Sequence, residues 1–418
     1  MQAKIVYAGS NNTSYQQAEA DLRELAELRV CGKQVRRVCK QIGSERCAER
    51  DAAAAEYQAK PLMERKAVPQ GVTAPDLAVV GTDGGRLQIF ERSAAAAEVV
   101  TADATGAAEA TEEAAEREEV GKHWREDKIG LLMTMTSDEH ESDPCPEIPE
   151  HFVNPLRILK LAREFKKPVP ATDEAAKDGS DPSADQQAYD DPEWEPPEVA
   201  TKHLVASRRP WEAFGPLVAT AAWQSGFYGA KRKAFLGDGA SSNWTLWRNH
   251  FSSFTPILDF IHALSYVFAA AMAGRAFQPG WECYARWIGW VWQGRLDEVL
   301  NELAARLSEL GEASDGEPTN SPRQVVTRAL EYLRNNRDRM KYAEYRQQGL
   351  PITSSYVESA VKQFNYRVKG TEKFWNEQGA EEMLQLRADL LSDDQLLKAF
   401  WQVREARESG QNRYRQAA

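Results

Sequence analysis

Residues 77–90, with the sequence LAVVGTDGGRLQIF, carry the strongest indication of the fold. An apolar run that suits a strand ends in an Asp-Gly-Gly sequence, and a second apolar run follows directly. Glycines between two such runs are typical of a tight turn. The pattern therefore predicts a hairpin of two strands, 77–82 and 86–90, with Asp83 at its turn.

Three more segments have the length and composition of strands. They are residues 128–136 (KIGLLMTMT), 233–237 (KAFLG) and 255–260 (TPILDF). Segments with helical spacing of apolar residues alternate with the last two, so we expect those two strands to be parallel. Three antiparallel strands followed by alternating helices and parallel strands predict an α/β fold with a mixed sheet of the ribonuclease H kind.

The length of 418 residues suggests two or three domains. We expect four regions: an N-terminal helical region at 1–70, the first part of a ribonuclease H-like core at 71–265, a helical insertion at 266–350, and C-terminal helices of the core at 351–418. Within the core, the segments at about 93–127 and 173–197 are acidic and are expected to be insertions.

Three acidic side chains occupy positions that a protein can bring to one point. Asp83 and Asp238 each follow a predicted strand, and Glu358 lies at the start of a predicted helix. In a sheet with this strand order, two of the strands end side by side, so their carboxylates can lie close together. Carboxylates at such a short distance stay ionised when a cation lies between them. The set suits two Mg²⁺ ions, with Mn²⁺ as an alternative, and phosphodiester chemistry. The simpler interpretation is that each Asp-Gly sequence marks a turn.

A second pair of polar residues follows the last predicted strand. Asp259 and His262 are three residues apart, at the point where a helix is expected to begin. They could support the metal site by orienting a ligand. The alternative is that Asp259 caps the helix and His262 packs in the core.

The N-terminal region contains a helix, a tight turn and a second helix with one basic face. The basic residues of this second helix, predicted to end at Gly43, are Lys33, Arg36, Arg37 and Lys40. A helix-turn-helix unit of this kind can lie in a DNA groove. An amphipathic helix pair of a larger bundle would have the same pattern.

Basic and aromatic side chains alternate in residues 362–375, just after the third acid. The basic members and the last aromatic residue are Lys362, Arg367, Lys369, Lys373 and Trp375. Such a segment suits a DNA strand, because cations pair with phosphates and rings stack on bases. A partly buried amphipathic segment is the alternative.

The net charge of −11 conceals an uneven distribution. Residues 92–200 hold 27 acidic and 11 basic side chains, and the rest of the chain holds 36 acidic and 41 basic ones. The remainder is therefore mildly basic, which is compatible with a phosphate-binding surface.

No apolar run approaches the roughly 20 residues that span a bilayer, and the N-terminus MQAKIVYAGSNNTSY has no leader of basic and then apolar residues. We therefore expect a cytoplasmic protein with no membrane partner. The five cysteines include no CxxC pair, and we expect them to be reduced thiols.

Together these segments resemble bacterial insertion-sequence transposases with a DDE catalytic triad, in the group typified by the Kra elements. The strings that carry the resemblance are GTDGGR, WREDKIG, ESDPCPE, GDGASSNW, ILDFIHA and PITSSYVESAVKQFNYRVKGTEKFW. By match to the family pattern, Asp83, Asp238 and Glu358 are the three catalytic and metal-binding acids. The Asp259 and His262 pair is similar to the acid-x-x-histidine motif that several such groups carry after the second acid.

The resemblance implies a ribonuclease H-like core and Mg²⁺-dependent cleavage and transfer of DNA strands. It also implies a homodimer or larger homo-oligomer assembled on transposon ends and target DNA, associated with the nucleoid. Two alternatives remain open from the sequence: a non-catalytic DNA-binding protein derived from a transposase, and a nuclease of the same fold.

Overall fold

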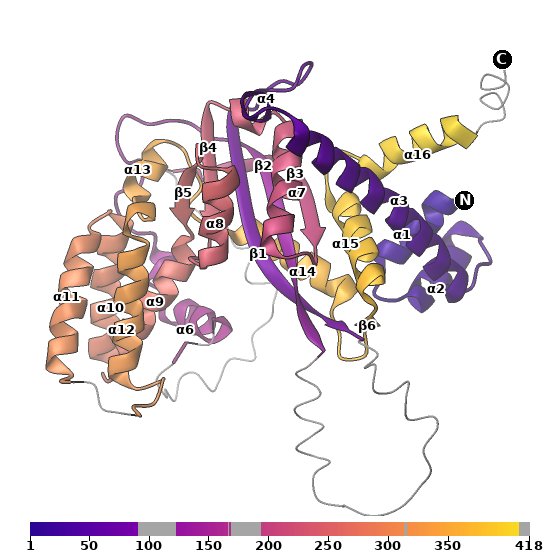
Figure 1. Cartoon of the computed structure of the whole chain (residues 1–418). Helices are drawn as coiled ribbons and strands as arrows, with labels where there is room; N and C mark the ends of the chain where they lie inside the picture. The colour runs from indigo at the N-terminus through magenta and orange to yellow at the C-terminus, as the bar shows by residue number, and fades with distance from the viewer. Residues whose placement is uncertain (91–122, 166, 169–193, 313–315, 409–418) are drawn as a thin grey trace, which may run out of the picture.

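The computed structural model describes residues 1–90, 123–165, 167–168, 194–312 and 316–408 (Figure 1). The predicted acidic insertions lie largely outside these ranges. Where the described residues overlap them, the boundaries differ: residues 124–127 belong to a strand, and Trp194 packs against the core beside Trp292.

A mixed sheet forms the centre of the molecule, as the α/β prediction requires. Its main strands are β1 (Leu77–Ile89), β2 (Trp124–Thr136), β3 (Glu198–Ser207), β4 (Arg232–Gly237) and β5 (Thr255–Leu258). Their order is β3-β2-β1-β4-β5, and a short sixth strand, β6 (Phe374–Trp375), pairs with the end of β1. Strand β2 runs antiparallel to both of its neighbours, β1 and β3. Strand β4 is parallel to β1, and β5 is parallel to β4.

The predicted hairpin at Asp83 is wrong. Strand β1 continues through the Asp-Gly-Gly sequence, and Asp83 pairs with Ile129 of β2 in the middle of the strand. Gly85 has a different role from a turn residue, because a Cβ atom there would lie 2.8 Å from both carboxylate oxygens of Asp127. The glycine therefore makes room for a buried neighbour on the next strand.

The third antiparallel strand is β3, which the sequence did not predict. It follows a segment rich in Asp, Glu and Pro, and its first half is partly exposed at the edge of the sheet. Of the three antiparallel strands that the sequence predicted, 77–82 and 86–90 are parts of the single strand β1, and 128–136 is the greater part of β2.

Helices cover both faces of the sheet. On one face, α14 (Ser355–Val368) approaches β1 so closely that a Cβ atom at Gly81 would lie 2.5 Å from Val357. Beside it on this face lies α15 (Glu377–Leu391). The other face is covered by α7 (Trp211–Gln224), which packs on Gly130, and by α8 (Ser241–His250).

A group of helices follows β5 and lies beyond that end of the sheet (Figure 1). Its members are α9 (Phe260–Met272), α10 (Phe277–Trp292), α11 (Leu296–Glu309), α12 (Pro322–Asn335) and α13 (Tyr342–Gln347). Trp287 and Trp292 are fully buried in this group and form part of its core. Shorter or peripheral helices are η3 (Glu150–Phe152), α6 (Pro155–Glu164), η6 (Phe227–Gly229), η7 (Arg337–Arg339) and α16 (Leu396–Glu408).

Four helices form the N-terminal region: α1 (Gln2–Asn11), α2 (Tyr15–Ala26), α3 (Gly32–Ala59) and α4 (Leu62–Arg65). The prediction that the basic helix ends at Gly43 is wrong, because α3 is 28 residues long and ends at Ala59. Gly43 instead allows contact with α15, since a Cβ atom there would lie 2.7 Å from the Cβ of Glu382. Ion pairs from Arg46 to Asp389 and from Arg50 to Glu381 extend the same contact.

None of the helices in the described ranges combines the length and the apolar character needed to cross a bilayer.

Candidate active site

Asp83 and Asp238 lie at the same level of two neighbouring strands. In the parallel pairing of β1 with β4, Gly81 is opposite Leu236. Asp83 follows Gly81 by two residues, and Asp238 follows Leu236 by two residues, directly after the end of β4. Neighbouring strands are about 4.8 Å apart. The two carboxyl groups are therefore close, and the charge of Asp238 acts directly on Asp83.

Glu358 joins them from the helix that covers this face of the sheet. Side chains alternate along a strand, so Asp83 points to the same face as Gly81. That face is where Val357 of α14 packs on Gly81. Glu358 is the next residue of this helix, and the charge of Asp83 contributes to raising its pKa. Of the three acids that the sequence singled out, Asp83 thus interacts with both of the others, Asp238 and Glu358.

Asp259 and His262 lie beside these acids and complete the candidate site. The Nδ1 of His262 lies 2.6 Å from Oδ2 of Asp259. The other carboxylate oxygen of Asp259 accepts the amide of Ile261 at 3.3 Å and the amide of Ser354 at 3.1 Å. Asp259 therefore caps α9, orients the imidazole and holds the residue that precedes α14. The two interpretations of this residue, a cap and a supporting ligand, are compatible.

The ligand atoms of Asp259, His262 and Glu358 all lie within 4.8 Å of one another, which is a geometry that could hold a metal ion. Both oxygens of Asp259 already accept hydrogen bonds. In the described part of the chain, Glu358 has no such partner, so its oxygens are the ones most open to a cation. Oxygen ligands of this kind suit Mg²⁺ or Mn²⁺.

The electrostatics of the site favour bound positive charge. Burial raises the pKa of Asp83, and the charges of Asp238 and Asp259 raise it further. Burial likewise raises the pKa of Glu358, with contributions from Asp259 and Asp83. For His262, burial opposes the charged form, but the hydrogen bond to Asp259 and the surrounding carboxylates raise the pKa above its usual value. Each shift means that the cluster holds protons, or a cation in their place, more tightly than isolated groups would.

Several residues that hold Asp238 in position were missed in the sequence. Its Oδ1 accepts the amide of Ala240 and the side-chain amide of Asn243, both at 2.8 Å. Asn243 in turn accepts the hydroxyl of Thr82 at 2.9 Å, and Tyr332 donates to the carbonyl of Asp238 at 2.6 Å. The sequence offered one signal, the position of Asn243 in the first turn of the helix after Asp238.

Most of the predicted DNA-binding side chains are accessible. Those exposed on the surface are Lys33, Arg36, Arg37 and Lys40 on α3, and Lys362 and Lys369 on or directly after α14. Lys362 also acts on the charge of Glu358. Lys373 and Trp375 are half-buried, and their side chains donate to backbone carbonyls at the end of α14.

Arg367 is the exception among these residues, because it is only 2% exposed. Its guanidinium lies 4.7 Å from the ring of Tyr15 and 5.1 Å from that of Trp375. Its Nε donates to the carbonyl of Gly9 at 2.9 Å. The alternation of basic and aromatic residues is therefore used in part inside the protein, by cation–π contacts.

No protein-family model matches this chain, and a search of curated proteins finds no relative.

Proposed function

We propose that this protein is a DNA transposase that cuts and joins DNA strands with divalent metal ions. The observation that supports this best is the convergence of Asp83, Asp238 and Glu358 beside a sheet of order β3-β2-β1-β4-β5. In this order, an acid in the first strand and an acid after the fourth strand lie next to each other. This is the arrangement expected of a ribonuclease H-like core.

In this proposal, each group of the site has a distinct task. Asp83, Asp238 and Glu358 hold two Mg²⁺ ions, or Mn²⁺, which would activate water or a 3′ hydroxyl and offset charge on the phosphate. Asn243 fixes the carboxylate of Asp238, and Asp259 fixes both His262 and the start of α14. The exposed cations of α3 and α14 bind the DNA backbone. Assembly on two transposon ends would require at least a homodimer, and work on DNA would take place at the nucleoid.

The test uses the purified full chain and DNA that carries the sequences flanking its gene on both sides. With Mg²⁺ we expect strand cleavage followed by joining to a target plasmid. Asp238→Asn and Glu358→Gln should each lower the rate by at least about a thousandfold, since each removes a metal ligand. Glu405→Gln, a matched change at an exposed site on α16, should leave the rate unchanged.

The same assay separates the alternatives. Specific binding without cleavage would favour a DNA-binding protein derived from a transposase, and cleavage without joining would favour a nuclease. Full activity in Asp238→Asn or Glu358→Gln would contradict the assignment of the site.

A further inference from the structure

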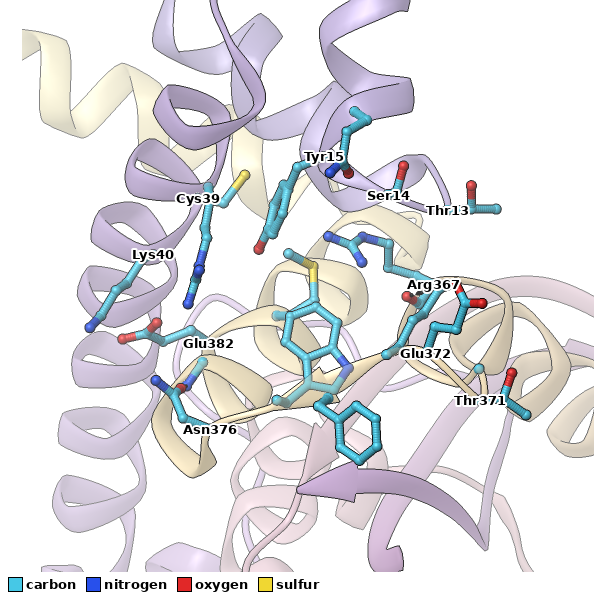
Figure 2. A pocket seen from close by; sticks show the side chains of 18 residues that line it. Thr13, Ser14, Tyr15, Cys39, Lys40, Arg367, Thr371, Glu372, Asn376 and Glu382 are labelled. Atoms are coloured by element: carbon cyan, nitrogen blue, oxygen red, sulfur yellow. Dashed lines mark hydrogen bonds between the residues drawn. The ribbon is translucent and has the colours of Figure 1, made fainter. Parts of the chain in front are cut away.

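A cavity of about 710 Å³ lies between the N-terminal helices and the loop that follows α14 (Figure 2). Thr13, Ser14 and Tyr15 line it from the connection between α1 and α2, and Arg36, Cys39 and Lys40 line it from α3. Residues 370–376 form the opposite wall. None of the five residues of the candidate active site lines this cavity, so it is a separate feature of the surface.

Arg367 gives the cavity a buried hydrogen-bond donor. The side chain is held on two sides by the rings of Tyr15 and Trp375, and its Nε is bonded to Gly9. Its Nη2 is buried and meets no acceptor at hydrogen-bonding distance and angle in the described part of the chain, although the hydroxyl of Tyr15 is near enough to interact with the guanidinium. Leaving such a donor unpaired is unfavourable, and more so for a charged group. An acceptor atom of a ligand in the cavity would remove this cost.

Glu382 gives the cavity a buried acceptor. It is 3% exposed, and neither of its carboxylate oxygens meets a donor at hydrogen-bonding distance and angle among the described residues. Burial raises the pKa of this side chain, although the charge of Lys40 and the nearby side chain of Gln378 lower it. In Figure 2 its carboxyl group lies between Lys40 and Asn376, across the cavity from Arg367.

The remaining lining residues point to a ligand with both an acidic and an aromatic part. The basic side chains of Arg36, Lys40 and Lys373 suit a phosphate. Trp375 and the half-exposed Phe374 offer ring faces for a planar group. The volume is within the range of about 300–1,000 Å³ for small-molecule sites and leaves room beyond a single phosphate. A nucleotide has the acidic group, the planar ring and the polar ring edge that these residues require.

The cavity lies at a fixed distance from the candidate active site. Arg367 follows Glu358 by nine residues on the same helix, which corresponds to about 14 Å. At the level of the sheet, β6 pairs with Gln88 and Ile89, which lie five and six residues after Asp83 on β1, or about 17–20 Å. A stacked strand that reaches the acids would pass the cavity about four to six nucleotides away, at roughly 3.4 Å per nucleotide.

We propose that this cavity binds one unpaired nucleotide of a DNA strand, with the phosphate on the cations of α3 and the base between the ring faces and the free groups of Arg367 and Glu382. The position of the strand relative to the acids rests on the proposed function. The binding of the nucleotide itself does not, since it needs neither a metal ion nor cleavage.

The test is photocrosslinking in EDTA with a 12-nucleotide oligothymidylate that contains 5-iodouracil, followed by mapping of the modified peptides. We expect crosslinks at Tyr15, Phe374 or Trp375, and at least a tenfold loss in the double variant Arg36→Gln, Lys40→Gln. Both of these side chains are exposed, so the variant should fold. Arg367→Lys, which keeps the charge but loses the planar fork, should lower crosslinking as well.

Competition identifies the part of the ligand that is bound. Thymidine monophosphate should compete more than tenfold better than inorganic phosphate, and the same 12-mer in a duplex should not crosslink in the cavity. Equal competition by inorganic phosphate, or crosslinks that map only elsewhere, would overturn the proposal. Glu358→Gln should crosslink normally, so loss of cleavage without loss of crosslinking would separate failure of the active-site assignment from failure of this one.

Discussion

The Nδ1 of His262 lies 2.6 Å from Oδ2 of Asp259 at the end of β5. The second oxygen of the same carboxylate holds the amide of Ser354, directly before the helix that carries Glu358. One side chain therefore couples the last strand of the sheet to the third acid, across about 95 residues of intervening chain. An asparagine would keep one acceptor oxygen but would lose the negative charge and would place an NH2 donor in contact with His262.

We expect Asp259→Asn to lower the pKa of His262 and to reduce strand cleavage by about 10–100-fold, the usual effect of losing a residue that orients a metal ligand. The pKa should fall because the aspartate raises it by its hydrogen bond and its charge. The measurement is an NMR titration of the His262 ring protons in the metal-free protein, alongside the cleavage rate. An unchanged titration curve would show that the pair is not coupled in solution.

The stability of the metal-free protein should fall as the pH rises. Asp83, Glu358 and His262 all have a folded pKa above their ordinary values of 3.8, 4.5 and 6.5. A group of this kind contributes its full stability below its unfolded pKa and loses it as the pH rises through the folded pKa. The decline from these three groups should therefore begin near pH 4 and continue above pH 6.5.

Thermal melting in EDTA between pH 4 and pH 8 measures this decline. Mg²⁺ in place of EDTA should restore stability most strongly at the upper end of this pH range. In Glu358→Gln the dependence on pH should be weaker, and the midpoint at pH 7.5 in EDTA should rise by about 2–4 °C. Glu405→Gln is the control. If Mg²⁺ raised the midpoint equally at pH 5 and pH 8, the carboxylates would not be its ligands.

Gly85→Ala should destabilise the protein by about 1–3 kcal/mol, because the new methyl group would press on the carboxylate of Asp127. Asp127 is fully buried, and burial raises its pKa to about 6. In the double variant Gly85→Ala, Asp127→Ala, the contact is removed, so the loss should be smaller than the sum of the two single losses. Chemical denaturation of the four proteins of this cycle checks the expectation; strictly additive losses would contradict it.

Gly43→Ala separates a helix-ending glycine from one that permits close packing. Alanine in place of glycine within an exposed helix stabilises it by up to about 1 kcal/mol. At Gly43 the methyl group would meet Glu382 of α15, so we expect a net loss of about 1–3 kcal/mol. Gly289 on α10 is the matched control, because nothing lies within 4 Å of a Cβ atom there. A gain in stability at both positions would argue against the contact between α3 and α15.

The salt dependence of DNA binding tests the basic face of α3. If Lys33 contacts a phosphate, Lys33→Gln should reduce the slope of log affinity against log salt by about 0.9. Lys398→Gln, an exposed change on α16, should leave the slope unchanged. Fluorescence anisotropy with a labelled duplex between 50 and 300 mM salt measures both. Equal slopes for all three proteins would remove Lys33 from the interface.

The sequence predicted which segments carry the catalytic-site acids better than it predicted where the strands in those segments begin and end. Asp83 and Asp238 were recognised because each follows a short apolar run, a local signal that does not depend on pairing. The hairpin at Asp83 was wrong because Gly84 and Gly85 have the composition of a turn, whereas here they belong to an extended strand paired to β2. The space that Gly85 leaves for Asp127 depends on the register of two distant segments, which no local pattern contains.

Other features depended on contacts between distant parts of the chain. Strand β3 is an edge strand with few buried residues in its first half, so its alternation is weak. Arg367 was expected to bind DNA, but its position between Tyr15 and Trp375 follows from the docking of the first helices on α14. Asn243 and Tyr332 reach Asp238 only in the folded chain.

The single long helix α3 limits how this protein can diverge. Its first turns carry the basic face, and its later turns are fastened to α15 at Gly43, Arg46 and Arg50. A different N-terminal segment could not simply replace this one, because the replacement would remove the contacts of α3 with α15. Changes on the inner side of α3 would have to be accompanied by matching changes on α15, so the two helices should be inherited together.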